Sequence, residues 1–207
     1  MAQSDLINIV ITGVGGQGNI LASQLVAQAA IEEGWFSSIG ETYGASQRGG
    51  SVMSHVRLSR GYQVGPLIPR GEADVVVGFE PLETLRVLLD YGNPDTRVIV
   101  NPRPTYPIGV MTGAITYPEV SKIVAAMSGA VAKVCVVPAT DLAQEKGVAI
   151  AQNVVMVGAL AGSGFLPLKV ESFHRALRES FSHDKLELNL GAFSSGIAGI
   201  AGCLGAS

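Results

Sequence analysis

Residues 7–18 read INIVITGVGGQG, an apolar and largely β-branched run of strand length that ends in four glycines within six residues. A helical pattern follows without interruption from Asn19 to about Glu33. A buried strand, a glycine loop and a helix are the opening unit of a doubly wound α/β fold. The sequence therefore predicts a Rossmann-like fold with a mainly parallel sheet, followed by a helical C-terminal segment.

The glycine loop is the first candidate binding site. Gly13, Gly15 and Gly18 satisfy the pattern G-x-G-x-x-G, and Gly16 is an additional glycine beside Gln17. In dinucleotide-binding proteins these glycines allow a tight turn, close approach of a ligand to the backbone, and close packing of helix on strand. The N–H groups at the start of the following helix favour an anion such as phosphate.

The remaining pattern predicts a single domain over residues 1–207. Strands are expected at 35–39, 51–58, 73–79, 97–101 and 133–138, and helices at 81–89, 118–127, 140–147, 148–161, 169–181 and 191–204. Residues 102–118 contain four prolines and are expected to form a loop with a short strand at 114–116. The stretch 51–58 alternates, which predicts one buried face and one face, with His55 and Arg57, toward solvent or a partner.

Small residues recur every four positions in the last predicted helix, at Gly191, Ser195, Gly199 and Cys203. Such a stripe lets a second backbone approach closely, and we expect it to pack within this domain. Cys135 and Cys203 lie far apart in apolar or small-residue surroundings, and we expect both to be buried free thiols in a reducing compartment. Two cysteines are too few for a four-cysteine zinc or iron–sulfur site.

Composition narrows the functional classes. Only 15% of the residues are charged, against roughly 25% in soluble proteins, so we expect part of the surface to be hidden against another subunit. The net charge of −3 argues against nucleic-acid binding. The N-terminal residues lack the features of a signal peptide, and polar residues interrupt the most apolar segment, 148–168, so no membrane association and a cytoplasmic location are expected.

The residues alone leave two hypotheses about the function of the protein. In a free-standing NAD(P)-binding oxidoreductase, Glu41 at the end of the second predicted strand would bind the ribose. Such an enzyme needs a general acid or base, yet the chain has only three histidines, of which His174 and His183 are expected at the surface. The alternative is a structural α/β module without a small-molecule ligand. The sequence lacks the motif of a serine-hydrolase elbow or a P-loop and has no clustered metal ligands.

Four segments, in this order, resemble the gamma component of the 2-oxoacid:ferredoxin oxidoreductases. They are GVGGQG at 13–18, GASQRGGSV at 44–52, SHVR at 54–57, and ELNLGAF at 187–193 with Gly196. The resemblance covers nearly the whole chain. Within that family the sequence is most similar to the beta subunit of the indolepyruvate type.

The resemblance implies that this chain is an accessory subunit of a complex that converts a 2-oxoacid and coenzyme A (CoA) to acyl-CoA and CO₂. Thiamine diphosphate, Mg²⁺ and iron–sulfur clusters are then expected on a catalytic partner subunit, with ferredoxin as the indirect electron acceptor. The isolated chain is expected to be inactive, with no catalytic residue and no cofactor or metal of its own. Family resemblance also implies that two loops face CoA or the partner, namely Gly13, Gly15, Gly16, Gln17 and Gly18, and Gln47, Arg48 and Gly49.

Overall fold

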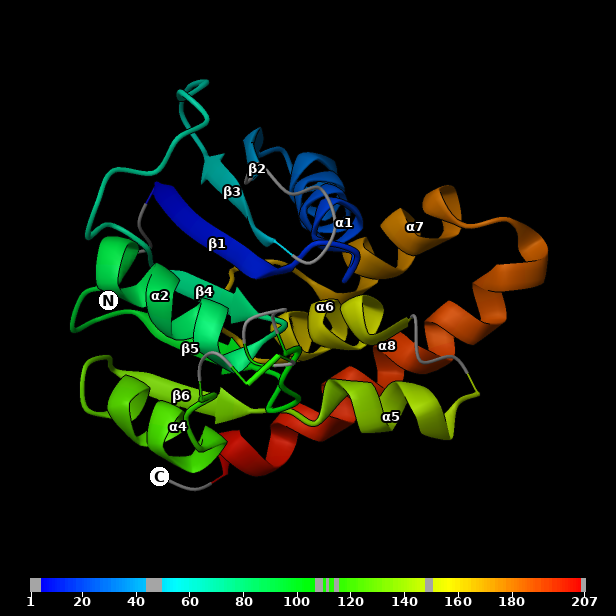
Figure 1. The fold of residues 1–207 in the computed structure, drawn as a ribbon. Coiled ribbons are helices and arrows are strands. Elements are labelled where there is room, and N and C mark those ends of the chain that lie inside the picture. Colours follow the sequence, from blue (N-terminus) through cyan, green and yellow to red (C-terminus); the bar gives the residue numbers. More distant parts are fainter. Residues whose placement is uncertain are drawn as a thin grey trace.

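A six-stranded sheet lies between two layers of helices in the computed structural model (Figure 1), which describes residues 5–43, 50–106, 110, 112–113, 116–147 and 151–205. The strand order is β2-β3-β1-β4-β5-β6. Strands β1, β4, β5 and β6 run parallel, whereas β3 is antiparallel to both of its neighbours, β1 and β2. The predicted mainly parallel α/β sheet is therefore confirmed, with one reversed strand inside it.

The elements agree with the predicted order. The strands are β1 (Leu6–Val14), β2 (Phe36–Tyr43), β3 (Ser51–Ser59), β4 (Val75–Gly78), β5 (Arg97–Val100) and β6 (Lys133–Val136). The helices are α1 (Asn19–Glu32), α2 (Pro81–Tyr91), α4 (Val120–Ser128), α5 (Ala139–Glu145), α6 (Gln152–Gly162), α7 (Val170–Ser180) and α8 (His183–Leu204). Helix α8 begins eight residues before the predicted start at Gly191. The strand expected at 114–116 falls largely on residues outside the described part of the chain.

Alternate residues of the central strands face two separate cores. On one face, Ile9 and Ile11 of β1 pack with residues of α1, α6, α7 and α8. On the other, Val10 of β1 packs with residues of α2 and α4. Both sides of the sheet are thus covered (Figure 1), which explains why consecutive residues of β1, β4 and β5 are buried.

The second face of β3 is buried at His55, contrary to the prediction that it meets solvent or a partner, whereas Met53 and Arg57 are half-buried and Ser51 is exposed. His55 is only 1% exposed, because the connection after β3 folds back over this face. The Ile68 N–H donates to His55 Nδ1 at 3.3 Å, and the imidazole lies edge-on to the Tyr91 ring at 5.1 Å. Arg57 on the same face donates to Asn8 Oδ1 and to the Gly65 carbonyl. Strand alternation identifies two faces but does not say which loops will cover them.

Helices α6 and α8 cross through glycines. A Cβ at Gly196 would lie 1.9 Å from the Val155 carbonyl oxygen, and one at Gly158 would lie 2.0 Å from the Phe193 carbonyl oxygen. Helix α8 thus packs closely against α6, but the close backbone contact is at Gly196, which lies outside the predicted stripe. A Cβ at Gly191 would meet no described atom within 4 Å.

The prediction of two free thiols is wrong: Cys135 and Cys203 form a disulfide. Cys135 is buried in β6, and Cys203 lies in the last turn of α8, which packs against the sheet at this strand. The 68 residues between them hide this proximity in the sequence. Helix α6 is almost entirely buried, as expected for the apolar segment. Among the described residues, no helix is long and apolar enough to cross a membrane.

Candidate functional site

The glycine loop connects β1 to α1 at the carboxyl edge of the parallel strands. Its backbone is fixed by two hydrogen bonds, from Gly15 N to Gly50 O at 2.8 Å and from Gln17 N to Val14 O at 3.1 Å. Gly16 and Gly18 have φ values of +102° and +88°, in the left-handed region that glycine adopts without steric cost. The loop therefore depends on glycine at these two positions for its shape.

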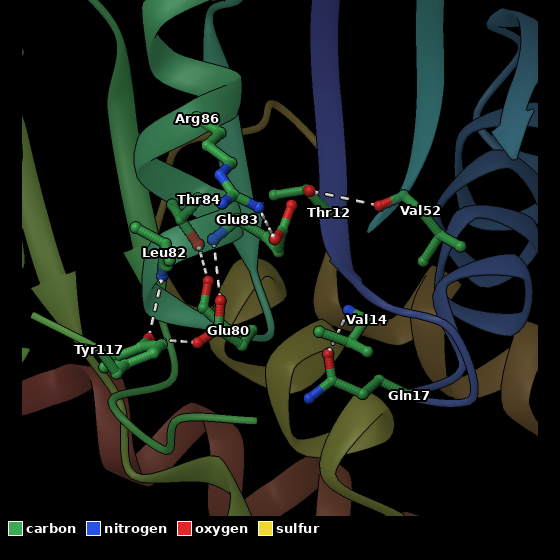
Figure 2. A network of polar contacts seen from close by, with 10 residues as sticks. All are labelled: Thr12, Val14, Gln17, Val52, Glu80, Leu82, Glu83, Thr84, Arg86 and Tyr117. Atoms are coloured by element: carbon green, nitrogen blue, oxygen red, sulfur yellow. Dashed lines mark hydrogen bonds and ion pairs between the residues drawn. The ribbon is translucent and has the colours of Figure 1, made fainter. Parts of the chain in front are cut away.

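The Gln17 side chain folds back over the loop (Figure 2). Its Oε1 accepts a hydrogen bond from Val14 N at 2.7 Å, and its Nε2 lies 3.3 Å from Phe79 O and 3.2 Å from Thr105 Oγ1. A Cβ at Gly13 would lie 2.5 Å from Gln17 Oε1. Gly13 thus makes room for a side chain of this protein, and Gln17 joins the carboxyl ends of β1, β4 and β5.

The remaining glycines face different neighbours. A Cβ at Gly18 would lie 2.2 Å from Asn153 Nδ2, so this position is closed by α6. Gly16 is exposed, and a Cβ there would meet no described atom within 4 Å. Of the predicted loop residues that the structure describes, Gly16 presents the backbone most openly. Gln47, Arg48 and Gly49 of the second predicted loop lie outside the described residues.

A cavity of about 510 Å³ opens beside the loop. It is lined by Gly16, Gln17 and Gly18, and by residues of α1, α6 and the start of α8. Leu21, Phe181 and Leu188 make its walls largely apolar, and the exposed side chains of Asp184 and Lys185 place one acidic and one basic group beside it. Such a cavity suits the apolar part of a ligand, and its two charged side chains are of opposite sign.

Glu41 does not serve as a free ribose ligand. One carboxylate oxygen accepts from the Ser23 hydroxyl at 3.0 Å, and the other accepts from the Ser54 hydroxyl at 2.6 Å. Strand β3 also separates β2, which carries Glu41, from β1. A dinucleotide site of the usual topology needs that acid on the strand beside β1, so these contacts weaken the NAD reading.

A polar group that sequence reasoning missed lies at the end of β4 (Figure 2). Glu80 is 1% exposed, and its carboxylate accepts from Glu83 N at 2.8 Å, from the Tyr117 hydroxyl, and from Thr105 N. Burial raises the pKa of Glu80 above its ordinary value, although these three donors oppose the rise. Burial and the adjacent Glu80 carboxylate raise the pKa of Tyr117. The only local signal was Glu80 just before Pro81, where a side chain can cap a helix.

A second missed group lies at the end of β5. Asn101, 1% exposed, donates through Nδ2 to Thr140 Oγ1 at 2.9 Å, and Thr140 Oγ1 donates to Gln152 Oε1 at 2.8 Å. Asn101 Nδ2 also lies 3.3 Å from Phe79 O, the carbonyl that Gln17 contacts. Polar side chains therefore follow the carboxyl ends of neighbouring parallel strands, where ligands bind in open α/β sheets.

The described residues contain no group of three or more His, Cys, Asp or Glu side chains that could hold a metal ion. The two cysteines are bonded to each other, so neither offers a thiolate to an iron–sulfur cluster. His183 is exposed, as predicted, whereas His174 is half-buried edge-on against the Phe193 ring. The arrangement of the described residues suits binding and positioning of a group.

Comparison with known proteins identifies the family. The model for "pyruvate ferredoxin/flavodoxin oxidoreductase" matches residues 8–199. The chain is 40% identical to indolepyruvate oxidoreductase subunit IorB of Archaeoglobus fulgidus over 190 residues, which cover 92% of this chain and 93% of that protein.

Two solved structures share the fold. The keto/oxoacid ferredoxin oxidoreductase gamma subunit of Geobacter sulfurreducens aligns with a TM-score of 0.72 at 22% identity, covering 97% of this chain and 99% of that one. The 2-oxoglutarate:ferredoxin oxidoreductase of Magnetococcus marinus, solved with 2-oxoglutarate, coenzyme A and succinyl-CoA bound, aligns with a TM-score of 0.69 at 24% identity. That alignment covers 95% of this chain and 31% of the longer one. The chain therefore belongs to the pyruvate ferredoxin/flavodoxin oxidoreductase family.

Proposed function

We propose that this chain is the accessory subunit of a thiamine-diphosphate-dependent 2-oxoacid:ferredoxin oxidoreductase. The observation that carries the proposal is the 40% identity to an indolepyruvate oxidoreductase subunit across nearly the full length of both proteins. Thiamine diphosphate with Mg²⁺ and the iron–sulfur clusters belong to the catalytic partner, where the thiamine group supplies the carbanion chemistry when bound. Only 15% of the residues are charged, which suits a chain whose surface is partly buried in a permanent complex.

The substrate we propose is indolepyruvate or another aryl-pyruvate. The test is to co-express this chain with its catalytic partner and to compare kcat/KM for indolepyruvate, pyruvate, 2-oxoglutarate and a branched-chain oxoacid. We expect an aryl-pyruvate to give the highest value. A complex that prefers pyruvate or 2-oxoglutarate would refute the substrate assignment while keeping the subunit role. A cytoplasmic location belongs to the same proposal, and cell fractionation tests it.

The glycine loop is the surface that we propose for CoA or the partner chain. The open backbone at Gly16, the start of α1, and the adjacent cavity, where Lys185 lies beside Asp184, support this assignment. Helix N-termini and lysine side chains both favour phosphate groups, which CoA carries. Gln47, Arg48 and Gly49 are proposed to complete the surface, on the basis of the family resemblance.

Arg48→Ala tests the second part of that surface in the assembled complex. We expect a higher KM for CoA or weaker assembly with the partner, because a guanidinium that contacts phosphate or a carboxylate is lost. Arg70→Ala is the matched control, since Arg70 is 82% exposed and precedes β4 at the opposite edge of the sheet. Unchanged assembly and unchanged CoA kinetics in Arg48→Ala would remove Arg48 from the site.

A further inference from the structure

The Glu80 carboxyl group makes more contacts than capping of α2 requires. Glu83 N, in the first turn of α2, occupies only one carboxylate oxygen, Oε2. The other oxygen, Oε1, accepts from the Tyr117 hydroxyl, which comes from 37 residues further along the chain. Tyr117 in turn accepts from Leu82 N at 3.3 Å. A buried carboxyl with these partners is fully engaged, and losing one partner would leave a buried polar atom unsatisfied.

The same carboxyl reaches the glycine loop through a single residue. The backbone N–H of Thr105 donates to Glu80. The side chain of Thr105 contacts Gln17, with Oγ1 3.2 Å from Gln17 Nε2. Gln17 then accepts the Val14 N–H at 2.7 Å. Hydrogen bonds therefore run continuously from the end of β4 to the end of β1.

Tyr117 also anchors the segment that carries Thr105. The rings of Tyr106 and Tyr117 meet edge to face, with centroids 5.3 Å apart and an interplanar angle of 83°. Residues 101–106 have no regular secondary structure, so their position depends on contacts of this kind rather than on a ladder of backbone hydrogen bonds. The phenol and the carboxyl thus hold this segment from two sides.

We propose that Glu80 and Tyr117 are positioning residues for the glycine loop, which hold Thr105 and through it fix the Gln17 side chain over the carboxyl end of β1. Neither residue touches the open backbone of Gly16, so each acts through Thr105 and Gln17. The functional consequence rests on the proposed function, in which the glycine loop contacts CoA. The structural consequence, a fixed Gln17, does not depend on that assignment.

Amide hydrogen exchange at Val14 reports directly on the Gln17 position, because Gln17 Oε1 is the acceptor for this N–H. Thr105→Val removes the hydroxyl that Gln17 contacts, and Tyr117→Phe removes the hydroxyl that Glu80 accepts. Loss of one net hydrogen bond corresponds to roughly a fivefold change in an equilibrium. We expect exchange at Val14 to accelerate by about fivefold in each variant, measured in the full chain.

Thr84→Val is the matched control. Thr84 is buried, and its hydroxyl donates to the backbone carbonyl of Glu80 at 2.6 Å rather than to the carboxyl group. This variant loses one hydrogen bond in the same helical turn but leaves Thr105 and Gln17 in place. After correction for global stability, we expect the exchange rate at Val14 to stay within a factor of about two of the wild-type rate. A factor of about two is the size of effect expected from a substitution that is not coupled to Gln17.

The second readout is kinetic, in the complex with the catalytic partner. Thr105→Val and Tyr117→Phe are expected to raise the KM for CoA by about fivefold while kcat stays near wild type, since they loosen a binding surface and touch no reacting atom. Faster exchange at Val14 together with a raised KM for CoA and an unchanged kcat supports the proposal. Faster exchange with unchanged CoA kinetics supports the positioning role and overturns the CoA assignment of the proposed function.

Two results would overturn the positioning role itself. One is unchanged Val14 exchange in both Thr105→Val and Tyr117→Phe, whatever happens to the CoA kinetics. The other is equal acceleration in Thr84→Val, which would mean that any loss around α2 loosens the loop.

Discussion

Gly18→Ala is expected to destabilise the protein through two separable effects. Gly18 has a φ of +88°, and an L-residue there costs about 1–2 kcal/mol. The new Cβ would also lie 2.2 Å from Asn153 Nδ2, and overpacking of this kind costs about 1–3 kcal/mol. Together, the free energy of unfolding should fall by about 2–5 kcal/mol.

The assay is urea unfolding of four proteins: wild type, Gly18→Ala, Asn153→Ala, and the double variant. Truncating Asn153 removes the overlapping atoms, so Gly18→Ala should cost only the backbone term of about 1–2 kcal/mol in that background. Gly16→Ala is a further control, because its φ is +102° and a Cβ there would meet no described atom within 4 Å. An equal cost of Gly18→Ala in both backgrounds would show that Asn153 does not close this position.

Three further predictions concern packing, the disulfide and pH. Gly196→Ala should lower the free energy of unfolding by about 3 kcal/mol or more, because the new Cβ meets the backbone of α6. Gly202→Ala, on an open part of the same helix, should leave the free energy of unfolding unchanged or raise it, and thermal unfolding measures both variants. Dithiothreitol should lower the free energy of unfolding by about 4 kcal/mol, as expected for a cross-link across 68 residues, and should have no effect on Cys203→Ala. Burial, followed by the nearby Arg57 charge, lowers the pKa of His55 below 6.5, so the unfolded state binds more protons and stability should fall as pH drops below about 6.5. In His55→Asn that part of the pH dependence should disappear; an identical acid profile would show that His55 is not its source.

The local pattern around the glycine loop was sufficient to predict β1, the turn and α1. The short, mostly apolar strands that are covered on both faces can be recognised in the sequence, because hydrophobic periodicity is a local property. The reversal of β3 between β1 and β2 was not evident, since the strand pattern is the same in either direction. The burial of His55 depends on residues 60–68, the connection that directly follows β3, and no local pattern tells which face of the strand such a connection will cover.

Of the candidate site, the sequence could predict only the part that consists of consecutive residues. Gly16, Gln17 and Gly18 lie together at the cavity, and their role in binding stays a prediction. Glu80, Thr105 and Tyr117 join the site through contacts between distant segments, which no spacing rule describes. The disulfide was missed for the same reason, because three helices, α5, α6 and α7, separate β6 from α8 along the chain.

The central claim, that this chain completes a catalytic partner and does not turn over substrate alone, is tested most directly by titration. A fixed amount of the partner subunit, loaded with thiamine diphosphate and its clusters, is mixed with increasing amounts of this chain, and oxoacid- and CoA-dependent reduction of ferredoxin is measured. We expect no rate from this chain alone, and a rate that rises with added chain and levels off at a fixed molar ratio. Turnover by this chain alone, or a partner that is fully active without it, would contradict the claim.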